Sequence, residues 1–273
     1  MASCKPENEI AINWIRDWVK SRLGVHFADN RLDVLESRLA TLSVRMGFAS
    51  ITALQEDLAA GTTSDVPIQV AHVCTTNHTH FFRESQILDY FQDKVLATLP
   101  PGDDWRMWSA ASSSGEELYT NAMILIQKYG LQQVSNHIAL LGTDVSANVI
   151  SQAERGIYHT RRLETMDSAI RGKFFKKAGL ENWVVNPEVR ALCTFRRMNL
   201  ISDHWPFSNQ FHVIFLRNVL YYFESETQEQ VLNQIYNVTL PHGWLITSVT
   251  ESITHLKTKW QKVSPGIYRK GAL

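Results

Sequence analysis

The sequence has few cysteines, no excess of either charge and no long apolar run. Its 3 cysteines (Cys4, Cys74, Cys193) are widely spaced with no CxxC pair, which argues against a disulfide framework or a zinc site and favours a reducing cytosol. Lys+Arg and Asp+Glu both count 27, which argues against a nucleic-acid binder or a membrane-surface protein. No run approaches the ~20 apolar residues of a membrane-spanning helix, and MASCKPENE lacks the apolar core of a signal peptide. We therefore expect a cytoplasmic globular protein that neither binds nucleic acid nor inserts into a membrane.

The apolar residues divide the chain into two regions. Residues 1–75 have helical spacing throughout, and Leu32, Leu35, Leu39, Leu42 and Met46 make an amphipathic stripe that ends at Gly47. We predict a small N-terminal helical domain over 1–75, with further helices from Ser50 to Gly61 and from Asp65 to Cys74.

From Trp105 onward, short apolar runs alternate with amphipathic stretches. This alternation predicts an α/β fold with a doubly wound, mostly parallel sheet over 76–273. Residues 157–198 do not fit the alternation, so we expect a small inserted subdomain there. The predicted strands are 105–110, 137–144, 211–218 and 244–251, with an edge strand at 266–270, and the predicted helices are 115–130, 146–156 and 227–240.

The stretch WSAASSSGEE (108–117) joins a predicted strand to a predicted helix through small side chains. Small residues let a ligand approach the backbone closely. The GxGxxG of dinucleotide folds and the Lys-Ser/Thr of a P-loop are both absent. Glu116 and Glu117 would repel phosphate and favour a cation or an ammonium group. The alternative role for one of them is to stabilise the positive end of the helix.

Two further strands are predicted to end in polar residues, where open α/β sheets form small-molecule sites. Asp144 follows one strand and would accept hydrogen bonds from ribose hydroxyls or, alternatively, cap the next helix. Arg217 and Asn218 end another strand in FLRNVLYYF (215–223), followed by Tyr221 and Tyr222. We expect one tyrosine to face the site while the other packs in the core. A core position for both is less favourable, because a buried tyrosine hydroxyl needs a hydrogen-bond partner.

These motifs together resemble the CheR-type chemotaxis receptor methyltransferases, over about Ile10 to Lys270. The resemblance is carried, in order and spacing, by TTNHTHFFRE (75–84), WSAASSSGEE, MNL (198–200), LRNVLYYF (216–223), VTES (249–252) and YRK (268–270). It implies a class I, Rossmann-like S-adenosylmethionine-dependent methyltransferase with an N-terminal helical domain and an inserted antiparallel β-subdomain. It also implies methylation of glutamate carboxylates on the cytoplasmic helices of chemoreceptors, with S-adenosylhomocysteine as product.

The resemblance implies a role for individual positions of this chain. The implied cofactor contacts are Asn77, Thr79, Arg83, Glu117, Asp144, Asn199, Leu200, Arg217 and Asn218. Tyr222 and Arg83 are the implied catalytic residues, with Tyr222 near the transferred methyl. Arg31, Arg38 and Arg45 recur every seven residues beside the leucine stripe and would recognise the acidic receptor helix, although a solvated helix face is the alternative interpretation.

The histidines do not predict a metal centre. His72, His78 and His80 lie at steps of six and two with no cluster of acidic residues or cysteines nearby, so no metal is expected. Two further functions stay open: methylation of carboxylates on another protein, and a cofactor-binding regulatory module without turnover. Nothing in the sequence demands more than a monomer.

Overall fold

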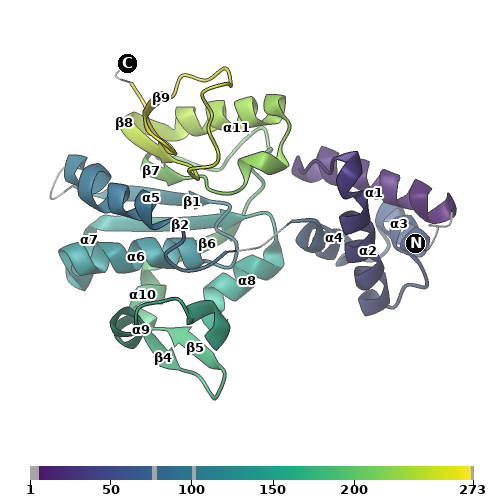
Figure 1. Cartoon of the computed structure of the whole chain (residues 1–273), viewed down its shortest axis with the longest axis horizontal. Helices are drawn as coiled ribbons and strands as arrows, with labels where there is room; N and C mark the ends of the chain where they lie inside the picture. The colour runs from purple at the N-terminus through teal and green to yellow at the C-terminus, as the bar shows by residue number, and fades with distance from the viewer. Residues whose placement is uncertain (1–5, 76–78, 100–102, 272–273) are drawn as a thin grey trace.

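The central feature of the fold is a mostly parallel β-sheet, seen in the computed structural model, which describes residues 6–75, 79–99 and 103–271 (Figure 1). Among these residues seven strands are joined in the order β6-β2-β1-β7-β8-β10-β9. The pairs from β6 to β8 are parallel, whereas β10 is antiparallel to both β8 and β9. The strands are β1 (Trp105–Ala110), β2 (Ile138–Asp144), β6 (Cys193–Arg197), β7 (Phe211–Phe215), β8 (Thr239–Ile246), β9 (Gln261–Ser264) and β10 (Ile267–Arg269).

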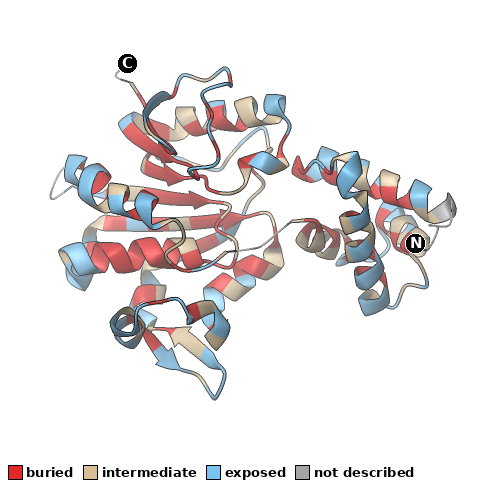
Figure 2. Cartoon of the chain, in the orientation of Figure 1, coloured by how far each residue is buried: buried red, intermediate tan, exposed pale blue. Residues whose placement is uncertain are grey.

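Alternating side chains of the central strands enter separate hydrophobic clusters on the two faces of the sheet. On β1, Met107 belongs to one cluster and its neighbour Trp108 to the other, and on β8 Ile246 and Leu245 divide in the same way. Strands buried on both faces read as continuous apolar runs. The buried centre of the sheet is visible in Figure 2.

The strands of the sheet are connected by helices, as the alternating pattern predicted. The helices of this region are α5 (Ser85–Tyr90), α6 (Glu116–Tyr129), α7 (Leu131–His137), α8 (Ala147–Arg155), α9 (Ser168–Phe174), α10 (Pro187–Leu192) and α11 (Ser225–Val238). A π-helical stretch (Phe91–Val95) and a 3-10 turn (Leu96–Thr98) continue α5.

Several details differ from the sequence prediction, among them the strands predicted over 211–218 and 244–251, which end at Phe215 and Ile246. Residues 193–197, which we assigned to the insertion, form β6 and pair with β2 in the main sheet. The strand predicted as an edge, β10, lies between β8 and β9. Strand β8 begins earlier than predicted, at Thr239. Its pairing with β7 is irregular, and this irregularity allows Pro241–Gly243, which we predicted as a turn, to lie within the strand.

Residues 6–75, called the helical part below, form a bundle beside the carboxyl ends of the parallel strands (Figure 1). Its helices are α1 (Pro6–Leu23), α2 (Leu32–Met46), α3 (Ile51–Ala60) and α4 (Val66–Cys74). Leu35, Leu39 and Leu42 of the predicted stripe are buried in a hydrophobic cluster of its own. Gly47 ends α2 in the left-handed conformation that glycine adopts without strain. No helix among the described residues is long and apolar enough to cross a membrane.

A small antiparallel sheet lies on the other side of α6, in the order β3-β5-β4 (Figure 1). Its strands are β3 (Ile157–His159), β4 (Phe175–Lys177) and β5 (Asn182–Val185), and a 3-10 turn (Thr160–Leu163) follows β3. Phe81 packs edge-on against Tyr158 and Phe175 of this sheet, with ring centroids 4.9 and 5.2 Å apart. The small sheet is therefore fixed to the main sheet through the segment that precedes α5.

Candidate functional site

A pocket opens at the carboxyl ends of β1, β2 and β7. The sheet order reverses direction at β1, and such a switch point is where open α/β sheets bind ligands. The pocket encloses about 980 Å³, its open mouth included. Its polar lining comprises Thr75, Thr79, His80, Arg83, Ser112, Ser113, Glu117, Thr120, Asp144, Asn199, Arg217, Asn218 and Tyr222.

The turn after β1 forms one wall of this pocket. Ala111 and Ser113 have φ of 76° and 50°, a left-handed conformation that costs energy for residues other than glycine. The amides of Ala111 and Ser112 donate to the Thr143 carbonyl oxygen at 2.9 and 2.7 Å, which holds the turn against β2. The Ser112 and Ser113 hydroxyls are buried without a hydrogen-bond partner among the described residues. Such buried donors favour a polar ligand in the pocket.

Asp144 joins the turn after β1 to the turn after β2. Its carboxylate accepts from the Ser113 amide at 3.0 Å and from the Ser146 amide at 2.9 Å. Burial raises the pKa of Asp144 to about 6, although these backbone hydrogen bonds oppose the rise. The residue at the capping position of α8 is Ser146, so Asp144 shapes the loop and faces the pocket without being the helix cap itself.

Arg217 is the centre of a charged network. The residue is only 7% exposed, and its Nη1 contacts Glu117 Oε2 at 3.0 Å while its Nη2 donates to the Arg83 carbonyl oxygen at 2.6 Å. Nη2 also lies 3.6 Å from Glu84 Oε2. Burial tends to raise the pKa of Glu84, but Arg217 and several hydrogen bonds outweigh it and lower that pKa. The strand-end arginine thus holds Glu117 and the segment before α5 in one arrangement.

The backbone after β7 is held by a buried glutamate. Asn218 has φ 57°, and its amide donates to Glu251 Oε2 at 2.6 Å, while the Leu220 amide donates to Glu251 Oε1 at 2.9 Å. Tyr222 lines the pocket. Tyr221 is 53% exposed, so it does not pack in the core as we expected for one of the two tyrosines. The Tyr221 hydroxyl donates to the Tyr222 hydroxyl at 3.3 Å.

The helical part forms the opposite wall of the pocket through Leu23 and Val25. Two hydrogen bonds attach this wall to the sheet region: Asn199 Nδ2 donates to the Arg22 carbonyl oxygen, and the His26 amide donates to the Tyr222 carbonyl oxygen, each at 2.7 Å. Gly24 lies between them with φ 72°, and a Cβ there would stand 2.7 Å from Ile201. The close approach of α1 to the pocket therefore requires a glycine at this position.

A second, polar groove, called the basic groove below, adjoins the pocket and shares Thr75 with it. Arg38 and Arg45 of α2, His72 of α4 and Arg162 of the turn after β3 line this groove, and no carboxylate is among its lining residues in the described structure. Arg45 donates to Gln69 Oε1 at 3.1 Å, and Arg38 donates to the Val73 carbonyl oxygen at 3.1 Å. Arg31 lies outside the groove, in an exposed 3-10 turn before α2.

The structure places most of the sequence-predicted site residues together. The pocket is lined by Thr79, Arg83, Glu117, Asp144, Asn199, Leu200, Arg217, Asn218 and Tyr222, whereas Asn77 lies outside the described residues. The sequence analysis did not predict Leu23, Val25 or Glu251 as site residues. A leucine or valine near the end of an amphipathic helix has no sequence feature that indicates a binding role. No group of three or more His, Cys, Asp or Glu that could hold a metal occurs among the residues that the structure describes.

The fold is that of a class I S-adenosylmethionine-dependent methyltransferase, in which a parallel sheet ends in an antiparallel strand pair. Residues 77–268 match the family model described as CheR methyltransferase, SAM binding domain. The chain belongs to this family.

Two chemotaxis protein methyltransferases match almost the whole chain. The chain is 33% identical to a chemotaxis protein methyltransferase of Vibrio parahaemolyticus, with 93% of this chain and 94% of that protein covered. It is 30% identical to a chemotaxis protein methyltransferase of Borreliella burgdorferi, with 92% and 91% covered. Among solved structures, SAM-bound CalS10 from Micromonospora echinaspora covers 60% of this chain and 49% of its own at 12% identity and a TM-score of 0.35, too low to support a functional argument.

Proposed function

We propose that this protein is a protein-glutamate O-methyltransferase, which transfers methyl groups from S-adenosylmethionine to glutamate side chains on the cytoplasmic helices of chemoreceptors and acts as a monomer. The single observation that supports this most strongly is the convergence of Glu117, Asp144 and Arg217 on one pocket in a chain of the CheR family. We further propose that residues 1–75 recognise the receptor and that residues 76–273 carry the chemistry.

The residues of the pocket fit this cofactor. Glu117 offers a carboxylate to the cofactor's ammonium group, and Asp144 offers one to its ribose hydroxyls. The hydroxyls of Ser112 and Ser113, which have no hydrogen-bond partner among the described residues, can form hydrogen bonds with further polar atoms of the ligand. Arg217 is committed to Glu117, so Arg83 is the arginine that we assign to the cofactor's own carboxylate.

S-adenosylmethionine supplies a methyl group bonded to a positively charged sulfur, and an ionised glutamate oxygen of the substrate takes that methyl. Because a glutamate with a reference pKa of ~4.3 is ionised at neutral pH, no general base is required. The work of the protein is then positioning and exclusion of water. Tyr222 lines the pocket from the loop after β7, where its hydroxyl orients the attacking carboxylate.

The basic groove is the proposed docking site for the acidic receptor helix, since it adjoins the pocket and carries Arg38 and Arg45. Replacing both with glutamate should raise the KM for a receptor fragment about tenfold or more, because attraction becomes like-charge repulsion. Steady-state kinetics at two salt concentrations measures this effect. The comparison variant is Arg31→Glu: the family resemblance also assigns Arg31 to receptor recognition, but this residue lies outside the groove, so if docking is in the groove its replacement should leave that KM within about twofold. Equal effects at both places would contradict docking in the groove.

The affinity for S-adenosylhomocysteine should depend on pH through Asp144. With the pKa raised to about 6 by burial, only about one-tenth of this carboxyl is ionised at pH 5, so the dissociation constant should be about tenfold weaker there than at pH 7. Titration calorimetry across this range measures the change, and Asp144→Asn should bind weakly at every pH. A pH-independent dissociation constant for the wild type would contradict the ribose role.

The same carboxyl should affect the unliganded fold in the opposite direction. A pKa that is higher in the folded protein than in the unfolded chain means that protonation favours folding. The contribution of Asp144 to the free energy of unfolding is therefore complete below about pH 4 and is lost as the pH rises through about 6. As the pH falls, the affinity for S-adenosylhomocysteine should decrease while the contribution of Asp144 to the stability of the unliganded protein increases. A nonspecific effect of acid would lower both quantities, so their opposite directions identify Asp144.

The proposed function is tested by incubating the protein with methyl-labelled S-adenosylmethionine and a chemoreceptor cytoplasmic fragment. Base-labile label on receptor glutamates is the expected result. Binding of the cofactor without any label on receptors would instead favour a different carboxyl substrate or a regulatory module without turnover. The reason to consider these alternatives is that the basic face of α2 is short and is interrupted by Thr41, Leu42 and Val44.

A further inference from the structure

The segment that precedes α5, residues 79–84, is strained and must be held in place by its surroundings. Phe82 and Glu84 have φ of 55° and 58°. Left-handed backbone at residues other than glycine costs free energy and persists only where neighbouring groups fix it. The segment contributes Thr79, His80 and Arg83 to the cofactor pocket, so whatever fixes it also shapes the site.

Three side chains from outside the segment bond to its backbone. The Phe82 amide donates to Thr120 Oγ1 of α6 at 3.1 Å, and Arg217 donates to the Arg83 carbonyl oxygen at 2.6 Å. The third bond holds the start of the segment: Arg162 Nη1 donates to the Thr79 carbonyl oxygen at 2.6 Å. Arg162 lies in the turn after β3, so this bond comes from the small sheet and not from the methyltransferase core.

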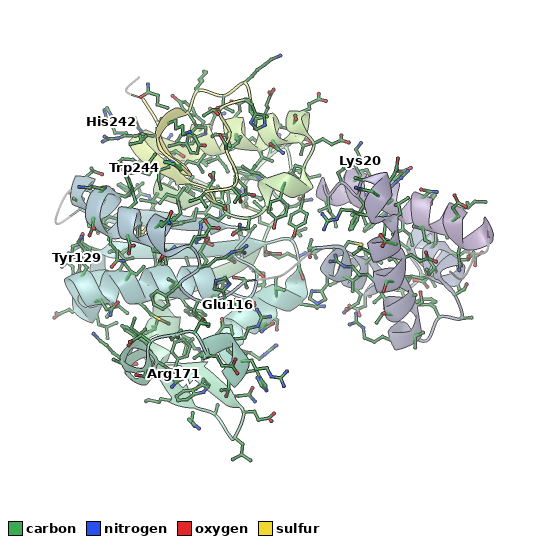
Figure 3. The ribbon with its side chains drawn as sticks, in the orientation of Figure 1. Lys20, Glu116, Tyr129, Arg171, His242 and Trp244 are labelled. Atoms are coloured by element: carbon green, nitrogen blue, oxygen red, sulfur yellow. The ribbon has the colours of Figure 1, made fainter. Side chains whose placement is uncertain are left out.

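A buried carboxylate on α6 lies beside Arg162. Glu116 has no exposed surface, and Ser114 Oγ donates to its Oε2 at 2.7 Å. Its Oε1 accepts no hydrogen bond from the described residues and lies 3.6 Å from Arg162 Nη1. Figure 3 labels Glu116 at the start of α6, on the side where the small sheet lies. Burial raises the pKa of Glu116, and the nearby Arg162 guanidinium opposes that rise in part.

The small sheet contacts the other cofactor loop as well. Tyr158 of β3 donates its hydroxyl to the Ser114 carbonyl oxygen at 2.6 Å, within the turn after β1. Phe81 packs against Tyr158 and Phe175. The strained segment and the turn after β1 thus share one support.

We propose that Arg162 is a positioning residue that holds the strained cofactor segment 79–84 in its binding conformation by linking the Thr79 carbonyl to the buried Glu116 carboxylate. The inserted sheet is then a structural support of the cofactor site. This inference rests on the proposed function, because it assigns the segment to S-adenosylmethionine.

The test compares the dissociation constant for S-adenosylhomocysteine, measured by titration calorimetry on the full chain, with kcat on a receptor fragment at saturating cofactor. Arg162→Met should weaken binding about tenfold, the equivalent of one hydrogen bond of ordinary net strength. Because Arg162 also lines the basic groove, kcat is measured at saturating cofactor and saturating receptor, where it should fall less than the affinity does. Arg161→Met, an exposed neighbour in the same turn, is the matched control and should bind as the wild type does.

Arg162→Met leaves Glu116 buried without its cation, which by itself destabilises the fold. The double variant Glu116→Gln, Arg162→Met removes that unpaired charge and is expected to fold with a melting temperature near that of the wild type, yet it still lacks the bond to Thr79. Its affinity should remain about tenfold weaker. Glu116→Gln alone keeps the Arg162–Thr79 bond and should bind more tightly than either variant that lacks Arg162.

Wild-type affinity in the folded double variant would overturn the inference, because stability alone would then account for any defect of Arg162→Met. A loss of kcat with unchanged affinity would also overturn it, since Arg162 would then contact the substrate from the basic groove. Failure of the wild type itself to bind S-adenosylhomocysteine would overturn the proposed function together with the inference.

Discussion

Replacement of Arg217 with methionine is expected to weaken S-adenosylhomocysteine binding by about two orders of magnitude and to abolish methyl transfer at ordinary cofactor concentrations. The guanidinium contacts Glu117 at 3.0 Å, Glu84 at 3.6 Å and the Arg83 carbonyl oxygen at 2.6 Å. Without it, two partly buried carboxylates lose their compensating charge, which costs about 3–5 kcal/mol when one partner of a buried pair is removed. The pKa of Glu84, lowered in part by Arg217, should rise.

The control for this experiment is Lys270→Met. Lys270 is a buried cation that is not among the pocket-lining residues, and its Nζ donates to the Tyr236 and Thr239 carbonyl oxygens, each at 2.7 Å. Both variants lose a buried charge and should melt at lower temperature, but only Arg217→Met should lose affinity. If the two variants bound the product within about threefold of each other, Arg217 would be a structural residue only.

Tyr222→Phe is expected to lower kcat about 100-fold, the typical effect of removing one hydrogen-bonding group that acts on a transition state. Affinity for S-adenosylhomocysteine should stay within about twofold, because the ring still fills the same wall of the pocket. Single-turnover measurement with a receptor fragment separates this chemical step from product release. An unchanged single-turnover rate would remove Tyr222 from the mechanism.

Tyr221→Phe is the matched control for that variant. Tyr221 is the neighbouring residue, is 53% exposed and loses the same hydroxyl group. Its ring centroid lies 4.4 Å from that of Tyr222, so any general disturbance of the loop should appear in both variants. We expect its kcat to fall much less than that of Tyr222→Phe, because it removes only a 3.3 Å hydrogen bond to the Tyr222 hydroxyl and leaves that hydroxyl in place.

Local sequence patterns predicted the elements whose formation depends on residues that are close together in the chain. The leucine stripe and Gly47 predicted α2, and Ser50 and Gly61 correctly marked the ends of α3, with Ser50 Oγ accepting from the Ala53 amide. The sequence did not predict which strand pairs with which in the sheet. Cys193–Arg197 reads CTFRR and contains no apolar run, and its place beside β2 is decided by long-range pairing that leaves no sequence signature.

The site was predictable to the extent that it follows strand ends. Glu117, Asp144 and Arg217 were inferred from polar residues after apolar runs, whereas Asn199 and Leu200 came only from the family resemblance. Glu251 supports Asn218 from another loop, and Leu23 and Val25 reach the pocket from the helical part. Contacts between distant segments depend on tertiary packing, which no local period encodes.

The pocket between the helical part and the sheet has a consequence for how the molecule unfolds. The helical part has its own hydrophobic cluster and could melt apart from the sheet, yet Leu23 and Val25 on one side and Asp144 and Asn218 on the other face the same space. A ligand that touches both regions stabilises both by mass action, so its binding converts two separable transitions into one cooperative event. The cofactor would then act as a reversible cross-link, and a cell short of it would hold a population of this enzyme that is more open to proteolysis at the α1–sheet contact.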